Sequence, residues 1–160
     1  MFWTKDKKTG GEESVTERVA IEAEGFFRSG KMHCAEAVLL AIRNAFRPEV
    51  PATVVEVASG FGGGSGTGCL CGAVAGGTMA LGLVLPEEKR RVKRLTQDLH
   101  HWFKGEYGAV CCRVVLQRNG KACAELTGKV AGKVAELLSW GGGRGLPPIS
   151  PPCPRNPAST

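Results

Sequence analysis

Apolar side chains recur at intervals of three and four residues along most of the chain, and this spacing predicts amphipathic helices. The first predicted helix begins at Ser14 and Glu17, which form a capping box, and it ends at Gly30. A second helix begins near His33 and stops before Pro48. No segment shows sustained alternation of apolar and polar residues, so the fold class is predicted to be all-α.

The middle of the chain predicts a glycine-rich loop followed by a buried helix. A short helix at 52–59 leads into the loop at 60–68, where the many glycines indicate tight turns or a close backbone approach. The helix at 71–85 is apolar nearly throughout. A glycine inside a helix costs about 1 kcal/mol relative to alanine, so close packing or a ligand must offset this cost. The glycines concerned are Gly72, Gly76, Gly77 and Gly82.

Three more helical segments are predicted in the C-terminal half. Pro86 fits the first turn of a helix that closes at Gly108. A short helical piece follows at 111–116, and after an Asn-Gly turn at 119–120 the last helix carries apolar residues in register from 126 to 137. Together these segments predict a compact bundle of about five to seven helices, with the glycine-rich loop before its buried helix.

Length and composition indicate one domain. At 160 residues with 42% hydrophobic content, the chain can bury a single sizeable core. We expect residues 1–13 to form a flexible N-terminal arm and residues 14–140 to form the helical four-cysteine domain. The proline- and glycine-rich residues 141–160 are expected to be a disordered tail.

The N-terminal residues lack the apolar stretch of a signal peptide and the paired arginines of a twin-arginine leader, so a cytoplasmic location is expected. The longest apolar run, at 71–85, is shorter than the roughly 18 residues that span a bilayer, so no membrane span is expected. In the cytoplasm the seven cysteines would stay reduced, which favours metal binding or redox chemistry over structural disulfides.

The net charge of +6 raises the question of nucleic acid, because basic residues cluster within 89–94. Aromatic content is only 6%, and the chain contains no nucleic-acid-binding motif. Glu87 and Glu88 precede the cluster, where a helix dipole favours acidic residues. We therefore interpret the cluster as a solvated helix face and expect no nucleic-acid partner.

Four cysteines carry the clearest candidate chemistry, and we refer to them as the four candidate cysteines: Cys34, Cys71, Cys112 and Cys123. The first three lie where a helix should begin, and the positive end of a helix dipole stabilises a thiolate and lowers its pKa. Thiolate is the form that binds iron or zinc and that attacks disulfides. A single buried cysteine is often inert, but four at loop–helix junctions indicate one shared metal or redox site.

Spacing decides which thiols can share that site. On one continuous helix Cys112 and Cys123 would lie about 16 Å apart, but the Asn-Gly turn between them lets the two arms fold back. Cys111 would point about 100° away from Cys112 on a helix, so only one of the two can face a shared site, and we choose Cys112. Cys71 has a better position in the helix dipole than Cys69.

Several neighbours remain alternative candidates or fall outside the site. Cys69, Cys111 and His33 are the alternative ligands, although a structural role is expected for His33 at a helix start. Cys153, in the proline-rich tail, is expected to be a free exposed thiol. His100 and His101 receive no role.

Other known motifs do not account for the pattern. The spacings match neither a ferredoxin run, nor paired C-x-x-C zinc knuckles, nor a haem-attachment motif. The glycine-rich loop has no preceding strand and no following Gly-Lys-Ser or Gly-Lys-Thr, which disfavours a phosphate site. We expect this loop to shape the wall of the thiol site, with Gly68 and Gly72 as cofactor-binding residues.

The glycines at 60–64 and the run Cys-Gly-Ala-Val-Ala-Gly at 71–76 resemble the C_GCAxxG_C_C family of putative redox-active proteins. The resemblance covers roughly residues 14–138, and the family's cysteines fall on the four candidate cysteines. It implies an all-helical domain with a redox role, association with a transporter system through neighbouring genes, and fusion to cytochrome modules in some members. The extra thiols Cys69 and Cys111 and the proline-rich tail depart from the family pattern.

Three functional hypotheses follow. We favour an iron–sulfur cluster of the [2Fe-2S] type, or another iron centre, held by the four candidate cysteines and passing electrons to a partner protein. The second is a metal-free redox protein in which two of these thiols cycle between dithiol and disulfide. The third is a structural zinc module. The glycine-rich helix could also pack against a second copy, which leaves a homodimer open.

Overall fold

The computed structural model describes residues 13–140, and every regular element in this range is helical. In chain order they are α1 (Val15–Arg28), α2 (Cys34–Phe46), the 3₁₀ helix η1 (Ala52–Phe61), the short π-helical turn η2 (Gly64–Gly68), α3 (Gly72–Val84), α4 (Lys89–Tyr107), α5 (Cys112–Asn119) and α6 (Cys123–Ser139). The predicted all-α fold is confirmed. The tail at 141–160 with Cys153, and the predicted arm except for Glu13, lie outside the described residues.

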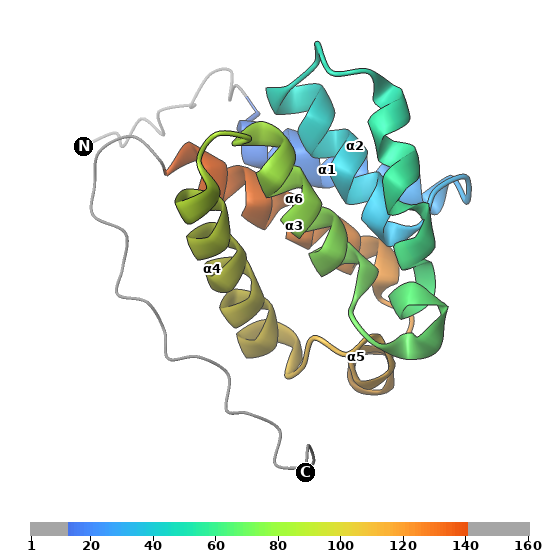
Figure 1. The fold of residues 1–160 in the computed structure, drawn as a ribbon. Coiled ribbons are helices and arrows are strands. Elements are labelled where there is room, and N and C mark those ends of the chain that lie inside the picture. The colour runs from blue at the N-terminus through green and yellow to red at the C-terminus, as the bar shows by residue number, and fades with distance from the viewer. Residues whose placement is uncertain (1–12, 141–160) are drawn as a thin grey trace, which may run out of the picture.

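The bundle is built around α3, whose residues from Gly72 to Gly77 are all buried. Helix α2 packs along one side of α3, while α4 and α6 contact it from other sides, and α1 lies along α6 (Figure 1). The largest fully buried side chains come from five helices and interlock in one core: Phe103, Leu39, Ile42, Leu81, Leu95, Leu99, Val19 and Val130. This packing explains why the helical stripes in the sequence are apolar.

Glycines allow the central helix to approach α2 closely. A Cβ at Gly76 would overlap the carbonyl oxygen of Ala35 and lie 2.8 Å from its Cα. A Cβ at Gly77 would lie 2.9 Å from a methyl carbon of Leu99. Close packing therefore offsets the cost of these glycines, as the sequence predicts. At Gly82 nothing lies within 4 Å of the added Cβ, so the expectation is wrong for that position.

Two helix boundaries differ from the prediction. Helix α4 begins at Lys89, not at Pro86, because the N–H of Glu88 donates to the carbonyl of Leu85 and closes a turn across the proline. Helix α5 continues beyond the predicted 111–116 to Asn119, where Gly120 at φ +61° ends it in a conformation that glycine tolerates.

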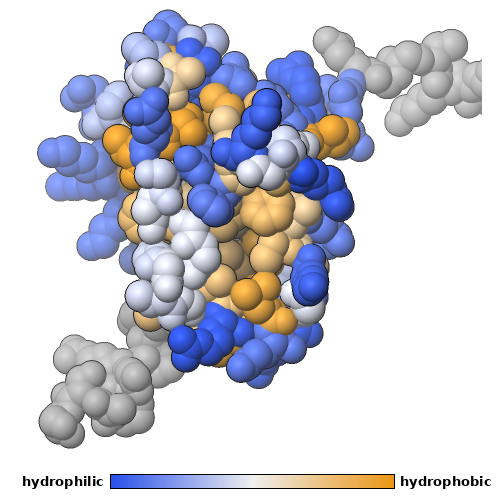
Figure 2. All heavy atoms as spheres, turned by 90° about the vertical axis from the view of Figure 1, so that its right-hand side faces the viewer, coloured by the Kyte–Doolittle hydropathy of each residue, from blue (hydrophilic) through white to orange (hydrophobic). Residues whose placement is uncertain are grey.

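The surface combines charged and apolar regions. Figure 2 turns the right-hand side of Figure 1 toward the viewer and shows apolar residues gathered in the middle of that face, with hydrophilic residues around them. Among the described residues, four large apolar side chains are exposed: Ile21, Val57, Leu116 and Trp140. Within residues 13–140, no helix combines the length and the hydropathy that crossing a membrane requires.

The capping box at the start of α1 gives a first testable prediction. Ser14 Oγ accepts a hydrogen bond of 3.2 Å from the N–H of Glu17, which satisfies one free donor of the first turn. Ser14→Ala should therefore lower the free energy of unfolding by about 1 kcal/mol in urea titrations. Ser59→Ala, at an exposed position in η1, serves as the control and should change it by less than about 0.5 kcal/mol.

Candidate functional site

The four candidate cysteines line one pocket, and each lies at the N-terminal end of a different helix. Cys34, Cys112 and Cys123 are the first residues of α2, α5 and α6, and Cys71 is the residue just before α3. The sequence predicted a helix start at three of these positions. The fourth, Cys123, also begins a helix, because the turn at Gly120 ends α5 a few residues earlier.

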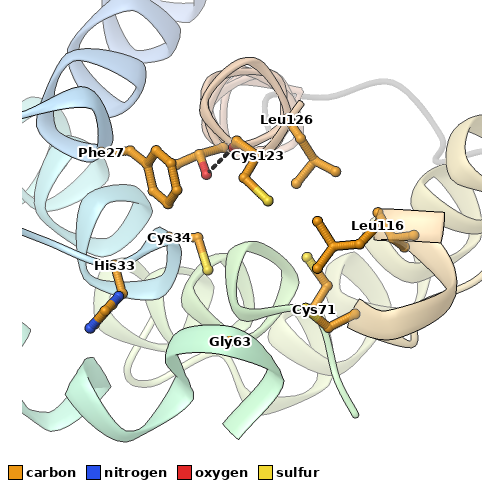
Figure 3. A pocket seen from close by; sticks show the side chains of 11 residues that line it. Phe27, His33, Cys34, Gly63, Cys71, Leu116, Cys123 and Leu126 are labelled. Carbon is orange, nitrogen blue, oxygen red and sulfur yellow. Dashed lines mark hydrogen bonds between the residues drawn. The ribbon is translucent and has the colours of Figure 1, made fainter. Parts of the chain in front are cut away.

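The remainder of the pocket wall is mostly apolar. The cavity has a volume of about 170 Å³ and is also lined by Phe27, His33, Gly63, Val115, Leu116, Leu126 and Thr127. The hydroxyl of Thr127 is already engaged, because it donates a 2.7 Å hydrogen bond to the carbonyl of Cys123 (Figure 3). No carboxylate lines the pocket, so its donor set toward a cation consists mainly of sulfur.

His33 serves as the residue that precedes α2. Its N–H donates a 2.9 Å hydrogen bond to Glu36 Oε2, and its ring packs close to Gly62, where an added Cβ would lie 2.7 Å from His33 Cγ. Figure 3 shows the imidazole extending away from the sulfurs of Cys34 and Cys123. The structure therefore places His33 at the edge of the pocket in the structural role that was expected of it.

A short backbone pairing holds Cys71 beside Cys112. Leu70 and Cys111 form an isolated antiparallel bridge, in which the N–H of Cys71 donates to the Val110 carbonyl at 2.8 Å and the N–H of Cys112 donates to the Cys69 carbonyl. This pairing joins the segment before α3 to the segment before α5. The sequence gives no sign of this pairing, because a single bridge has no alternating pattern.

The same bridge separates the candidate thiols from their neighbours. The Cys111 thiol donates to the carbonyl of Gly68 at 3.2 Å, and Cys69 is exposed. Neither lines the pocket that Cys71 and Cys112 share. All cysteines within residues 13–140 are free thiols.

Glycines make room for the sulfurs. A Cβ at Gly72 would overlap the sulfur of Cys34, and a Cβ at Gly64 would lie 2.6 Å from the Cβ of Cys112. Gly72 thus touches the site, as the sequence suggested, while Gly64 was not singled out. Gly68 lies beside Arg113, at φ +77°, and is not part of the pocket wall. The signal for Gly64 was present in the glycine-rich loop, but nothing in the sequence ranked one glycine of that loop above another.

Burial dominates the electrostatics of the site. It raises the pKa of Cys34, Cys112 and Cys123 above the ordinary value of 9.0, and that of Cys71 to about 12. Hydrogen bonds from the N–H groups of Ala73 and Val74 oppose the change at Cys71 but do not cancel it. The expectation that helix N-termini would lower these pKa values is wrong, because loss of water outweighs the dipole.

The sulfurs also influence one another. Negative charge on Cys123 and Cys112 raises the pKa of Cys34, and charge on Cys34 and Cys112 raises that of Cys71. The raised pKa values mean that these thiols are mostly protonated at neutral pH.

Within residues 13–140, no three histidine, cysteine or acidic side chains lie close enough together to hold a single metal ion.

Comparison with known proteins agrees with this arrangement. The family described as "Putative redox-active protein (C_GCAxxG_C_C)" matches residues 32–137, which contain all four candidate cysteines. The chain belongs to this family. No curated protein and no solved structure matches the chain. The family is described as redox-active, and this C_GCAxxG_C_C protein is rich in cysteine.

Proposed function

We propose that this C_GCAxxG_C_C protein is an electron-transfer protein that binds an iron–sulfur cluster, of the [2Fe-2S] type, through the four candidate cysteines. The observation that supports the proposal is the meeting of four cysteines from four helix ends at one apolar pocket without carboxylates. Thiolates in apolar surroundings are the usual ligands of iron–sulfur clusters. When bound, such a centre supplies one-electron transfer.

The residues fit a polyatomic centre better than a single ion. A tetrahedral zinc site with Zn–S bonds near 2.3 Å needs its sulfurs within about 3.8 Å of one another. Among the described residues, no three histidine, cysteine or acidic side chains are grouped so that they could hold one metal ion. The cavity of about 170 Å³ between the sulfurs exceeds the roughly 30 Å³ that one water occupies. A structural zinc site is therefore the least favoured of the three hypotheses.

A metal-free dithiol carrier is also less favoured. Thiols that attack disulfides at neutral pH have lowered pKa values, generally about 3.5 to 7.5. The four candidate cysteines show the opposite change, and Cys71, with a pKa of about 12, would hold almost no thiolate at pH 7. A bound cation would replace these protons, so high pKa values are compatible with metal ligands but not with fast thiol exchange.

The direct test is anaerobic purification followed by iron and acid-labile sulfide analysis. We expect about two irons and two sulfides per chain, with visible absorption that bleaches on reduction. A colourless protein without iron or sulfide would overturn the proposal. Tightly bound zinc would support the structural module, and one defined disulfide after mild oxidation would support the dithiol carrier.

Single substitutions sharpen this test. Cys34→Ala and Cys112→Ala should each lose most of the bound iron, because a cluster with three ligands is much less stable. Cys69→Ala and Cys111→Ala are matched controls, since they remove thiols next to the site that do not line the pocket, and they should retain the iron. If the control variants lost as much iron as the pocket variants, the loss would not be due to removal of a cluster ligand.

The setting of this electron transfer is also a proposal. We place the protein in the cytoplasm, where thiols are kept reduced, and give it a protein partner that accepts or supplies single electrons. The transporter association and the homodimer suggested by the sequence analysis are further proposals. They can be tested by size-exclusion chromatography with light scattering and by co-purification with the transporter subunits.

A further inference from the structure

The segments of the chain that carry the four candidate cysteines contain basic residues and no acidic ones. The segments 29–35, 57–75 and 108–124 surround the four candidate cysteines and contain no aspartate or glutamate. They contain four basic residues, all exposed: Lys31, Arg113, Arg118 and Lys121. Cations without interspersed carboxylates are unusual on a protein surface, where both signs are normally mixed.

Two carboxylates in the first turns of the helices that carry Cys34 and Cys123 are already engaged. Glu36, in the first turn of α2, accepts the N–H of His33 at 2.9 Å. Glu125, in the first turn of α6, forms a 2.6 Å ion pair with Lys129. Neither carboxylate pairs with the four cations in the structure. Arg113, Arg118 and Lys121 therefore carry positive charge that neither carboxylate neutralises by direct pairing.

Packing orients part of this charge. Arg113 Nη2 donates a 3.0 Å hydrogen bond to the carbonyl of Thr67, which holds its guanidinium over the glycine-rich loop. The guanidinium of Arg118 packs against Gly108, where an added Cβ would overlap it. Both side chains therefore hold positive charge at defined positions on the surface beside α5.

The cations flank an apolar side chain that belongs to the pocket itself. Leu116 is 40% exposed and also lines the cavity, so this one side chain joins the outer surface to the pocket wall. We infer that the face formed by α5 and its following turn, with Arg113, Arg118 and Lys121, is the docking surface for an acidic electron-transfer protein. This inference rests on the proposed function and names the partner chemistry.

A protein partner fits this surface better than a nucleic acid. An apolar centre with a charged rim is the usual anatomy of a protein interface, and complementary charge mainly increases the association rate. Sequence-tolerant binding of single-stranded nucleic acid relies on aromatic stacking. The segment 108–124 contains no phenylalanine, tryptophan or tyrosine.

Two forms of one electron acceptor can test the inference. Native cytochrome c is basic, and its succinylated form is acidic while keeping the same haem. We expect the reduced, cluster-loaded protein to pass electrons to the acidic form at least tenfold faster at about 10 mM salt. The difference should disappear near 0.5 M salt, where charges are screened beyond about 4 Å.

Charge reversal on this face should invert the preference. The double variant Arg113→Glu/Lys121→Glu should transfer electrons faster to the basic form. The control Lys89→Glu/Lys93→Glu changes the net charge equally at exposed positions on α4. Helix α4 starts at the far end of α3, about 20 Å from the pocket, and this variant should keep the wild-type preference. The inference would be overturned if both double variants changed the preference between the two cytochrome c forms equally. It would also be overturned if single-stranded RNA bound tightly to Arg113, Arg118 and Lys121.

A second readout does not depend on the cluster. In the metal-free full chain with Cys69, Cys111 and Cys153 replaced by alanine, the remaining thiols can be modified with methanethiosulfonates of opposite charge. We expect the anionic reagent to react several-fold faster than the cationic one, and Arg113→Glu/Lys121→Glu to remove the difference. If the anionic reagent reacts faster but the purified protein contains no iron, the cluster is refuted and the positive face is supported. If the protein contains the cluster but shows no preference for either charge, only the docking surface is refuted.

Discussion

Gly76→Ala should lower the free energy of unfolding by about 3 kcal/mol, near the upper end of what overpacking usually costs. The added methyl group would overlap the carbonyl oxygen of Ala35 and lie 2.8 Å from its Cα. Because these are backbone atoms of α2, no side-chain rotation can relieve the overlap, and the two helices must move apart. Cys34 precedes Ala35, so the pocket should be distorted as well.

Gly82→Ala, on the same helix, is the matched control. Nothing lies within 4 Å of its added Cβ, so the change should raise the free energy of unfolding by about 0.5–1 kcal/mol through helix propensity alone. Urea titrations of both variants measure the two effects, and iron analysis of Gly76→Ala reports on the pocket. If the two variants had equal stability, α2 and α3 would not be packed as closely as the structure indicates.

The helices could be predicted from the sequence because their cause is local. The N-cap hydrogen bond at Ser14, the stop before Pro48 and the apolar spacing in α6 all act within a few residues, and each appears in the structure. The start of α4 was misplaced at Pro86 because proline is compatible with both a first helical turn and the preceding turn. The choice between them depends on how Leu85 packs into the core.

That the four candidate cysteines line one pocket could also be expected, since the sequence predicts a helix start at three of them and a turn between Cys112 and Cys123. The pKa values of the cysteines in the site could not be predicted. The dipole effect on Cys71 is local and visible in the sequence, but the loss of water that raises its pKa comes from residues remote in the chain. The Leu70–Cys111 bridge, which separates Cys69 from Cys112, likewise joins segments about forty residues apart and leaves no local signal.

Alkaline pH should destabilise the metal-free, reduced protein through Cys71. In the unfolded chain this thiol ionises near its ordinary pKa of 9.0, whereas in the folded protein it stays protonated until about pH 12. Between these values the unfolded state binds fewer protons, so stability falls as the pH rises, by about 1.4 kcal/mol per pH unit. The full difference amounts to about 4 kcal/mol, and none of it is lost below pH 8.

Urea titrations at pH 8, 9, 10 and 11, with a reductant present, can isolate this contribution by comparing the wild type with Cys71→Ala. At pH 8 the variant should be the less stable of the two, because it leaves a small cavity. By pH 11 the wild type should have lost about 2.5 kcal/mol more than the variant, so that the two curves converge or cross. Cys69→Ala, at an exposed position, should follow the wild type throughout. Parallel curves for the wild type and Cys71→Ala would mean that this thiol is accessible to water. Its pKa would then not be raised, and the argument from a high pKa against thiol exchange would no longer hold.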